Sequence, residues 1–195
     1  AAELGRRAAL LLEAERLSTR ERRLVEITTA LAAAGTVAEA ARVMAVGVRD
    51  AFGATAVAAY LRDPALGLRV VHSSGYPDLL LRHYGVVRAE DDQPVGVCAR
   101  TAEPVWLRSD EDWRERFPHL TEHHAVTGNE ALMALPMLVG GRVVGALAAS
   151  FATRRTFDLD EQQFARTVCA HAAQAFERAA LADTRREIAE TLQHS

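Results

Sequence analysis

Lysine is absent from this sequence, and no stretch of it is strongly basic. All 23 positively charged residues are arginine, and against 26 acidic residues they leave a net charge of −3. General binding to nucleic acid or to an anionic membrane surface needs a positive field that gathers phosphate groups, which this chain lacks. The all-arginine usage, together with the many alanines, indicates a GC-rich coding bias and not a site.

Cysteine and long apolar runs are scarce as well. Cys98 and Cys169 lie far apart in the sequence and are too few for a disulfide framework, which fits a reducing compartment. The N-terminal run AAELGRRAALLLEAERL interleaves Arg and Glu with a few leucines, which is typical of neither a signal peptide nor a membrane span. We therefore expect a cytoplasmic protein that contacts no membrane and no nucleic acid.

The residues that are present describe an ordinary globular chain. Of 195 residues, 49% are apolar and 25% are charged, which suits one well-buried soluble domain and is short for two. The last residues, REIAETLQHS, are amphipathic and contain no Gly or Pro to end a helix. We therefore expect this chain to be a piece of a longer protein.

A long helix is predicted over about residues 4–34, a stretch without proline. Its leucines recur every seven residues on one slowly drifting stripe, at Leu10, Leu17, Leu24 and Leu31. Two interpretations fit this stripe: the helix lies on the domain, or it pairs with a second copy of the chain. Gly35 is suited to end the helix.

A second helix is predicted to follow at once. Thr36 and Glu39 have the spacing of a capping box, and an apolar face runs from Val37 to Phe52. Gly53 is suited to end this helix, because glycine readily adopts the left-handed conformation found at helix ends.

Strands joined in hairpins are predicted over much of the remaining chain, because apolar runs alternate with Gly, Asp-Pro and Gly-Gly turn signals. These runs lie at 54–63, 66–75, 103–108, 131–139 and 142–151. Short helices are predicted at 78–85 and 95–101, and a long one begins at Phe157-Asp158. The order favours an α+β fold with a central antiparallel sheet and the helices of both chain ends packed together on one face.

Residues 109–129 are predicted to form a folded lid. They are polar, yet they contain Trp113, Phe117 and three histidines, a composition that is unusual in a linker.

No catalytic residue is predicted. The sequence contains no Walker loop, dinucleotide-binding glycine pattern, HExxH or paired-cysteine metal motif. Ser73-Ser74-Gly75 lacks the flanking pattern of a hydrolase nucleophile, so its serines are expected to be loop residues.

Four segments in order resemble the GAF domain, a small-molecule-sensing module of many signalling proteins. They are FGATAVAAYLRDP, QPVGVCARTAEPVWL, ALMALPMLVGGRVVGALAASF and TFDLDEQQFARTVCAHAAQAFERAAL. The resemblance covers residues 28–181. It leaves 1–27 as an N-terminal signalling helix and 182–195 as the start of a linker helix to a missing effector domain.

A second resemblance concerns the end of the chain. The run ERAALADTRREIAETLQHS is similar to the helix that joins a GAF domain to a stage-II-sporulation-type serine/threonine phosphatase in bacterial regulators. This implies a parent phosphatase, metal-dependent and involved in sigma factor regulation, whose catalytic residues lie outside this chain. The piece itself would then be a non-catalytic regulatory domain that forms a homodimer through its first and last helices.

The GAF resemblance implies a ligand pocket between the sheet and the lid. The residues expected to line it are Tyr60, Tyr84, Cys98, Trp106, Trp113, Met133 and Leu135. The alternative is that these apolar side chains fill the core. The ligand is not identified by the sequence, and the NKFDE-type signature of cyclic-nucleotide-binding relatives is missing.

The lid histidines offer a different function, a heme- or redox-sensing domain. His119 and His123 would share a face if the lid were helical, and heme-binding GAF domains place an iron-ligating histidine near this stretch, which also contains His124. This chain departs from that arrangement by a residue or two, and the simpler interpretation is a solvated polar loop. No metal and no cofactor is therefore predicted.

Cys98 has two functional interpretations through the same resemblance. Relatives attach a bilin to a cysteine, and the free-methionine-sulfoxide reductases use several cysteines around the pocket. Here the bilin signature is missing and Cys98 has no resolving partner nearby in the sequence. A small buried residue is the expected role.

Overall fold

Capping interactions set the ends of the first two helices in the computed structural model, which describes residues 2–88 and 90–193. α1 (Ala2–Ala33) is followed by α2 (Val37–Phe52), where Thr36 Oγ1 accepts a hydrogen bond from Glu39 N at 3.2 Å. The Glu39 carboxylate accepts from Gly35 N at 2.9 Å, one residue before the usual capping-box partner. Gly53 has φ +66° and ends α2 in the left-handed conformation. The sequence predicted both helices and this cap.

Six strands form one antiparallel sheet, which confirms the predicted fold class. They are β1 (Ala56–Asp63), β2 (Gly67–Ser74), β3 (Val86–Val87), β4 (Val105–Leu107), β5 (Ala131–Val139) and β6 (Arg142–Phe151). Their order is β3-β2-β1-β6-β5-β4, so the two longest hairpins meet at the central β1–β6 pair. The predicted turn at Gly140-Gly141 joins β5 to β6, and both glycines have positive φ. β3 was not predicted, because two residues carry no periodicity.

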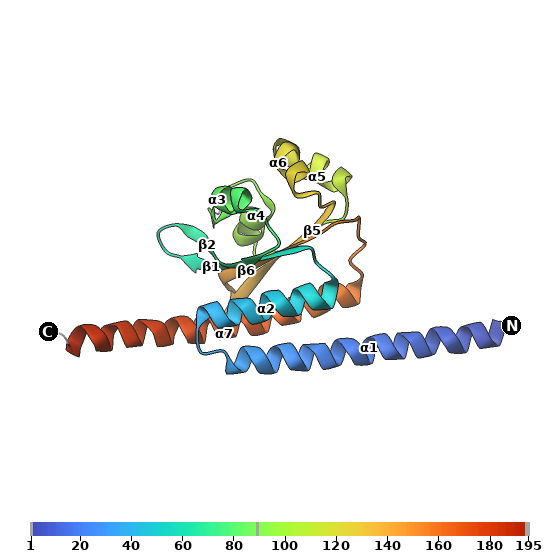
Figure 1. Ribbon diagram of the computed structural model, residues 1–195, viewed down its shortest axis with the longest axis horizontal. Coiled ribbons are helices and arrows are strands. Elements are labelled where there is room, and N and C mark those ends of the chain that lie inside the picture. The colour runs from blue at the N-terminus through green and yellow to red at the C-terminus, as the bar shows by residue number, and fades with distance from the viewer. Residues whose placement is uncertain (1, 89, 194–195) are drawn as a thin grey trace.

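Helices cover the two faces of the sheet in different ways. α1, α2 and α7 (Leu159–Gln193) form a layer of long helices on one face, so the helices from both ends of the chain pack together as predicted (Figure 1). Short helices cover the other face: α3 (Asp78–Tyr84), α4 (Pro94–Thr101), α5 (Asp110–Arg116) and α6 (Thr121–Thr127), with a 3-10 turn at Pro118–Leu120. Residues 109–129 thus form a folded lid.

Strand alternation divides the apolar side chains into two cores. In β5, Met133 and Leu135 face the long helices, whereas Leu132 and Ala134 face the short ones. Gly145 of β6 pairs with Leu61 of the neighbouring strand β1, and a Cβ atom there would stand 2.3 Å from the Tyr60 carbonyl oxygen. The close approach of these two strands therefore depends on glycine.

α1 is only partly covered by the rest of the fold. Ile27 and Leu31 are buried and Leu24 packs beside them, against the core under α2 and α7. The N-terminal half of α1 extends beyond the sheet at one end of the molecule, and α7 extends beyond it at the other (Figure 1). The side chains of Leu10 and Leu17 lie outside the described residues. Among the helices described, none has the length and apolar character needed to span a membrane.

Candidate functional site

A cavity of about 100 Å³ lies between the sheet and the short helices. Fourteen of the described residues line it, from the sheet, α3, α4, the loop before α4 and the lid: Tyr60, Tyr76, Leu80, Leu81, Tyr84, Gln93, Pro94, Val95, Trp113, Leu120, Thr127, Leu132, Ala148 and Ser150. Its floor is the sheet, because alternation turns Tyr60, Ala148 and Ser150 toward the lid. α3 and α4 supply one wall and the lid supplies the other.

The cavity is apolar and carries no formal charge. Among the described side chains, its lining contains no Asp, Glu, Lys, Arg or His. The Tyr76 hydroxyl and Ser150 Oγ share a hydrogen bond of 2.7 Å at the floor. Burial raises the pKa of Tyr76 to about 12 and also raises the pKa values of Tyr60 and Tyr84, so all three phenols are neutral at ordinary pH. Such a lining suits binding, since it holds no group that would act as a general acid or base near neutral pH.

A contact beside the cavity joins the lid to the loop that precedes α4. His119 Nε2 lies 2.7 Å from the Asp92 carbonyl oxygen, next to the cavity-lining Gln93. The same loop packs tightly on α4, because a Cβ atom at Gly96 would stand 2.2 Å from the Asp91 carbonyl oxygen. The lid and α4 are therefore held together at this edge.

The predicted pocket residues separate into two groups. Tyr60, Tyr84 and Trp113 line the cavity. Cys98 is buried in the core on the same side but does not line it.

The other three predicted residues belong to the opposite core. Met133 and Leu135 face the long helices, and Trp106 packs on Phe157 with ring centroids 5.1 Å apart. In β5 the cavity is lined by Leu132. Met133 and Leu135, which were expected there, lie one and three positions later and therefore face the opposite side of the sheet. Tyr76, Leu80 and Ser150 were missed by sequence reasoning; only the strand alternation around Ser150 could have indicated its orientation.

The histidines are not on one continuous helix. His119 lies in the 3-10 turn and is half-exposed, and α6 begins only at Thr121. The side chains of His123 and His124 lie outside the described residues. Within the described part of the chain, no three His, Cys, Asp or Glu side chains gather as a metal site. Burial raises the pKa of Cys98 to about 12 and raises that of Cys169 further, so both thiols are held in the unreactive neutral form.

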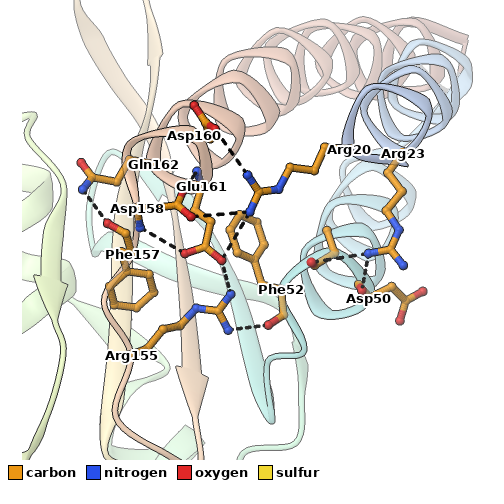
Figure 2. Close-up of polar contacts among 11 residues, drawn as sticks. Arg20, Arg23, Asp50, Phe52, Arg155, Phe157, Asp158, Asp160, Glu161 and Gln162 are labelled. Carbon is orange, nitrogen blue, oxygen red and sulfur yellow. Dashed lines mark hydrogen bonds and ion pairs between the residues drawn. The ribbon is translucent and has the colours of Figure 1, made fainter. Parts of the chain in front are cut away.

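A polar junction lies on the other side of the sheet, where α7 begins (Figure 2). Arg155 Nη1 donates to the Phe52 carbonyl oxygen at 2.7 Å, and its Nη2 donates to Glu161 at 2.6 Å. The guanidinium also lies 4.6 Å from the centroid of the Phe151 ring. The backbone N–H of Arg155 donates to the Arg108 carbonyl oxygen at 2.8 Å, immediately before the lid.

α1 reaches the same junction through two arginines. Arg20 lies 3.8 Å from each of Asp158, Asp160 and Glu161 at the start of α7 (Figure 2). Arg23 donates to the Asp50 carbonyl oxygen at 3.0 Å, near the end of α2. The side chains of this junction therefore link α1, α2 and α7. The backbone N–H of Arg155 joins the junction to the segment that leads into the lid.

Known proteins share this architecture and match this sequence. The family model of the GAF domain matches residues 36–176. The GAF domain from Acinetobacter phosphoenolpyruvate-protein phosphotransferase superposes with a TM-score of 0.70 at 18% identity, covering 85% of this chain and 98% of that one.

Two further solved structures have the same fold. Free methionine-R-sulfoxide reductase from Neisseria meningitidis, in complex with its substrate, gives a TM-score of 0.68 at 18% identity, with 84% and 91% of the two chains covered. A GAF domain/HD domain protein from Geobacter sulfurreducens gives 0.62 at 19% identity, with 75% and 95% covered. A search of curated proteins found no match. On the family match over most of its length, this chain belongs to the GAF domain family of sensory and regulatory modules.

Proposed function

We propose that this chain is the regulatory input of a cytoplasmic signalling protein. Its cavity binds a small molecule, α1 and α7 pair two copies, and α7 passes the change to a fused serine/threonine phosphatase of the stage-II-sporulation type. In this scheme residues 1–27 are a signalling helix, 28–181 the GAF domain, and 182–195 the start of a linker. The chain itself carries no catalytic residue.

The observation that carries the proposal is the path from the cavity to α7. The lid that walls the cavity begins just after Arg108, whose carbonyl oxygen is bonded to Arg155 N. The side chain of Arg155 in turn holds Glu161 in the first turn of α7. A ligand that moves the lid therefore acts on the start of the exit helix, and two helix positions that differ by a few kcal/mol are enough for a switch.

The leucine stripe supports the proposed pairing of two copies. Leu24 and Leu31 are covered by the domain, which fits the interpretation that α1 lies on it. In the sequence, Leu10 and Leu17 continue the same stripe toward the N-terminus, and the N-terminal half of α1 extends beyond the sheet (Figure 1). A second copy would cover that half, so each of the two interpretations applies to a different part of the helix.

The phosphatase partner is supported by the sequence alone. Residues 177–195 are similar to the helix that joins GAF domains to phosphatase domains of this type. α7 runs as one helix from the sheet-packed Phe164 to Gln193, which suits a rigid connection to a following domain.

Sedimentation equilibrium of the chain tests the pairing. We expect a dimer that Leu17→Glu weakens by at least about tenfold, because a carboxylate replaces an apolar group in each helix of the pair. Leu12→Glu is the matched control, because it is the same substitution at a leucine that lies off the stripe. Equal weakening by both variants, or a monomer at every concentration, would contradict pairing through α1.

A further inference from the structure

We propose that the cavity takes a neutral molecule about the size of one aromatic ring, with a hydroxyl group placed against Tyr60. This inference rests on the proposed sensing role and specifies the class of ligand. It follows from the charge, the size and the unused hydrogen-bonding capacity of the cavity, taken in turn.

Charge is the first restriction. The side chains described in the lining include neither a cation to pair with a carboxylate or phosphate nor an anion to pair with an amine. An ion moved from water into such a site loses its hydration and gains no partner, which costs far more than the burial of a neutral group. The cavity therefore selects against ionised metabolites.

Size is the second restriction. The cavity measures about 100 Å³, whereas pockets for drug-sized ligands enclose roughly 300–1,000 Å³. Tyr84 and Trp113 present aromatic rings, and Leu80 and Leu132 complete an apolar surface. A single ring or a compact aliphatic of similar volume fits this space, and a nucleotide or a porphyrin exceeds it.

The Tyr60 hydroxyl is the third feature. Tyr60 is only 5% exposed and lines the cavity, and none of the hydrogen bonds among the described residues includes its hydroxyl. The neighbouring Tyr76 hydroxyl is already bonded to Ser150 Oγ. A ligand hydroxyl that bonds to the Tyr60 hydroxyl gains a hydrogen bond that a bare ring cannot make. Tyr60 is thus positioned to distinguish a hydroxylated ring from a bare one.

Tryptophan fluorescence makes the test direct, because one of the two tryptophans lines the cavity and the other faces the opposite core. The Trp106→Phe variant keeps Trp113 as the sole reporter and is titrated with phenol, toluene, benzoate and benzylamine at neutral pH. We expect saturable binding of phenol and toluene, with benzoate and protonated benzylamine at least about tenfold weaker. The Trp113→Phe variant is expected to lose the signal.

Two variants assign the site. Tyr60→Phe removes one hydroxyl, so phenol is expected to bind about two- to tenfold more weakly while toluene is unchanged. Ala148→Leu fills the floor and is expected to abolish binding of both. Circular dichroism melts confirm folding, and if Ala148→Leu fails to fold, the comparison of phenol with toluene on Tyr60→Phe decides.

Three results would overturn the inference. They are binding of benzoate or benzylamine as tight as that of phenol, an equal loss of phenol and toluene in Tyr60→Phe, and no saturable binding of any probe. Binding of a charged probe would leave the sensing role intact and remove only the ligand class. Phenol binding by a chain that does not dimerise would keep the ligand class and remove the proposed relay.

Discussion

At the scale of single residues, the cavity depends on which side of a strand each side chain occupies. Leu132 lines it and Met133 points the other way, so an error of one position exchanges a ligand contact for a core residue. The resemblance to GAF domains implied Tyr60, Tyr84 and Trp113 as pocket residues, and these three side chains line the cavity. Sequence reasoning missed Tyr76 and Ser150 because their pairing joins residues 74 positions apart, which no local pattern reveals.

The hydrogen bond between Tyr76 and Ser150 gives a prediction for stability. Tyr76→Phe is expected to lower the free energy of unfolding by about 0.5–1.5 kcal/mol, because Ser150 Oγ is left buried without its partner. Urea denaturation of both single variants and of the Tyr76→Phe/Ser150→Ala double variant measures this. The account requires the double variant to cost less than the sum of the singles; simple additivity would show that the bond contributes nothing.

Cys98 gives a prediction that separates sensing from thiol chemistry. Burial raises the pKa of its thiol from 9.0 to about 12, so the thiolate is scarce until the pH approaches that value. The folded-state pKa lies above the unfolded one, so this group favours the folded state fully below about pH 9, and the effect is lost as the pH rises toward 12.

We therefore expect iodoacetamide at neutral pH to leave Cys98 unmodified in the folded chain and to label it after unfolding. Peptide mass spectrometry reads the result, and the equally buried Cys169 serves as the internal control. Rapid and selective labelling of Cys98 in the folded chain would favour the redox alternative.

At the scale of elements, local signals predicted most of the fold. The capping box at Thr36, the stop at Gly53 and the Gly140-Gly141 turn each fix an element end through a few neighbouring residues. β3 and the break between the 3-10 turn and α6 were not predicted, because both depend on packing against distant parts of the chain. The junction around Arg155 was not predicted for the same reason, since it brings together residues of α1, of the end of α2 and of the start of α7 (Figure 2).

That junction predicts unequal roles for two glutamates of α7. Glu161 is mostly buried and bonded to Arg155 at 2.6 Å, whereas Glu177 is more exposed and bonded to Arg142 at 2.9 Å. Glu161→Gln is expected to destabilise the fold by about 1–3 kcal/mol, because it leaves a poorly solvated guanidinium without its carboxylate. Glu177→Gln is expected to cost less than about 1 kcal/mol, as for an exposed ion pair.

Thermal and urea unfolding of the two variants provide the measurement. Hydrogen exchange adds a local readout, since loss of Glu161 should speed exchange in α1 near Arg20 as well as at the start of α7. Equal costs for the two glutamates would contradict the structural role given to the junction.

At the scale of the whole molecule, the fold places the cavity and the long helices on opposite faces of one sheet (Figure 1). Element order was enough to predict this layered arrangement, and the resemblance of four segments to GAF domains indicated the family. The ligand and the effector could not be deduced in the same way, because a fold carries many functions and the site decides among them. The segment from β6 to α7 links the two faces. It is hydrogen-bonded to Arg108, immediately before the lid, and forms an ion pair with Arg20 of α1.

Native mass spectrometry of the unmodified chain, before and after addition of phenol, tests the central claim that a ligand-binding cavity and a helix-paired dimer exist in one molecule. The account predicts a dimer that gains up to one phenol per chain. A monomer, or a chain that gains no phenol, would contradict it.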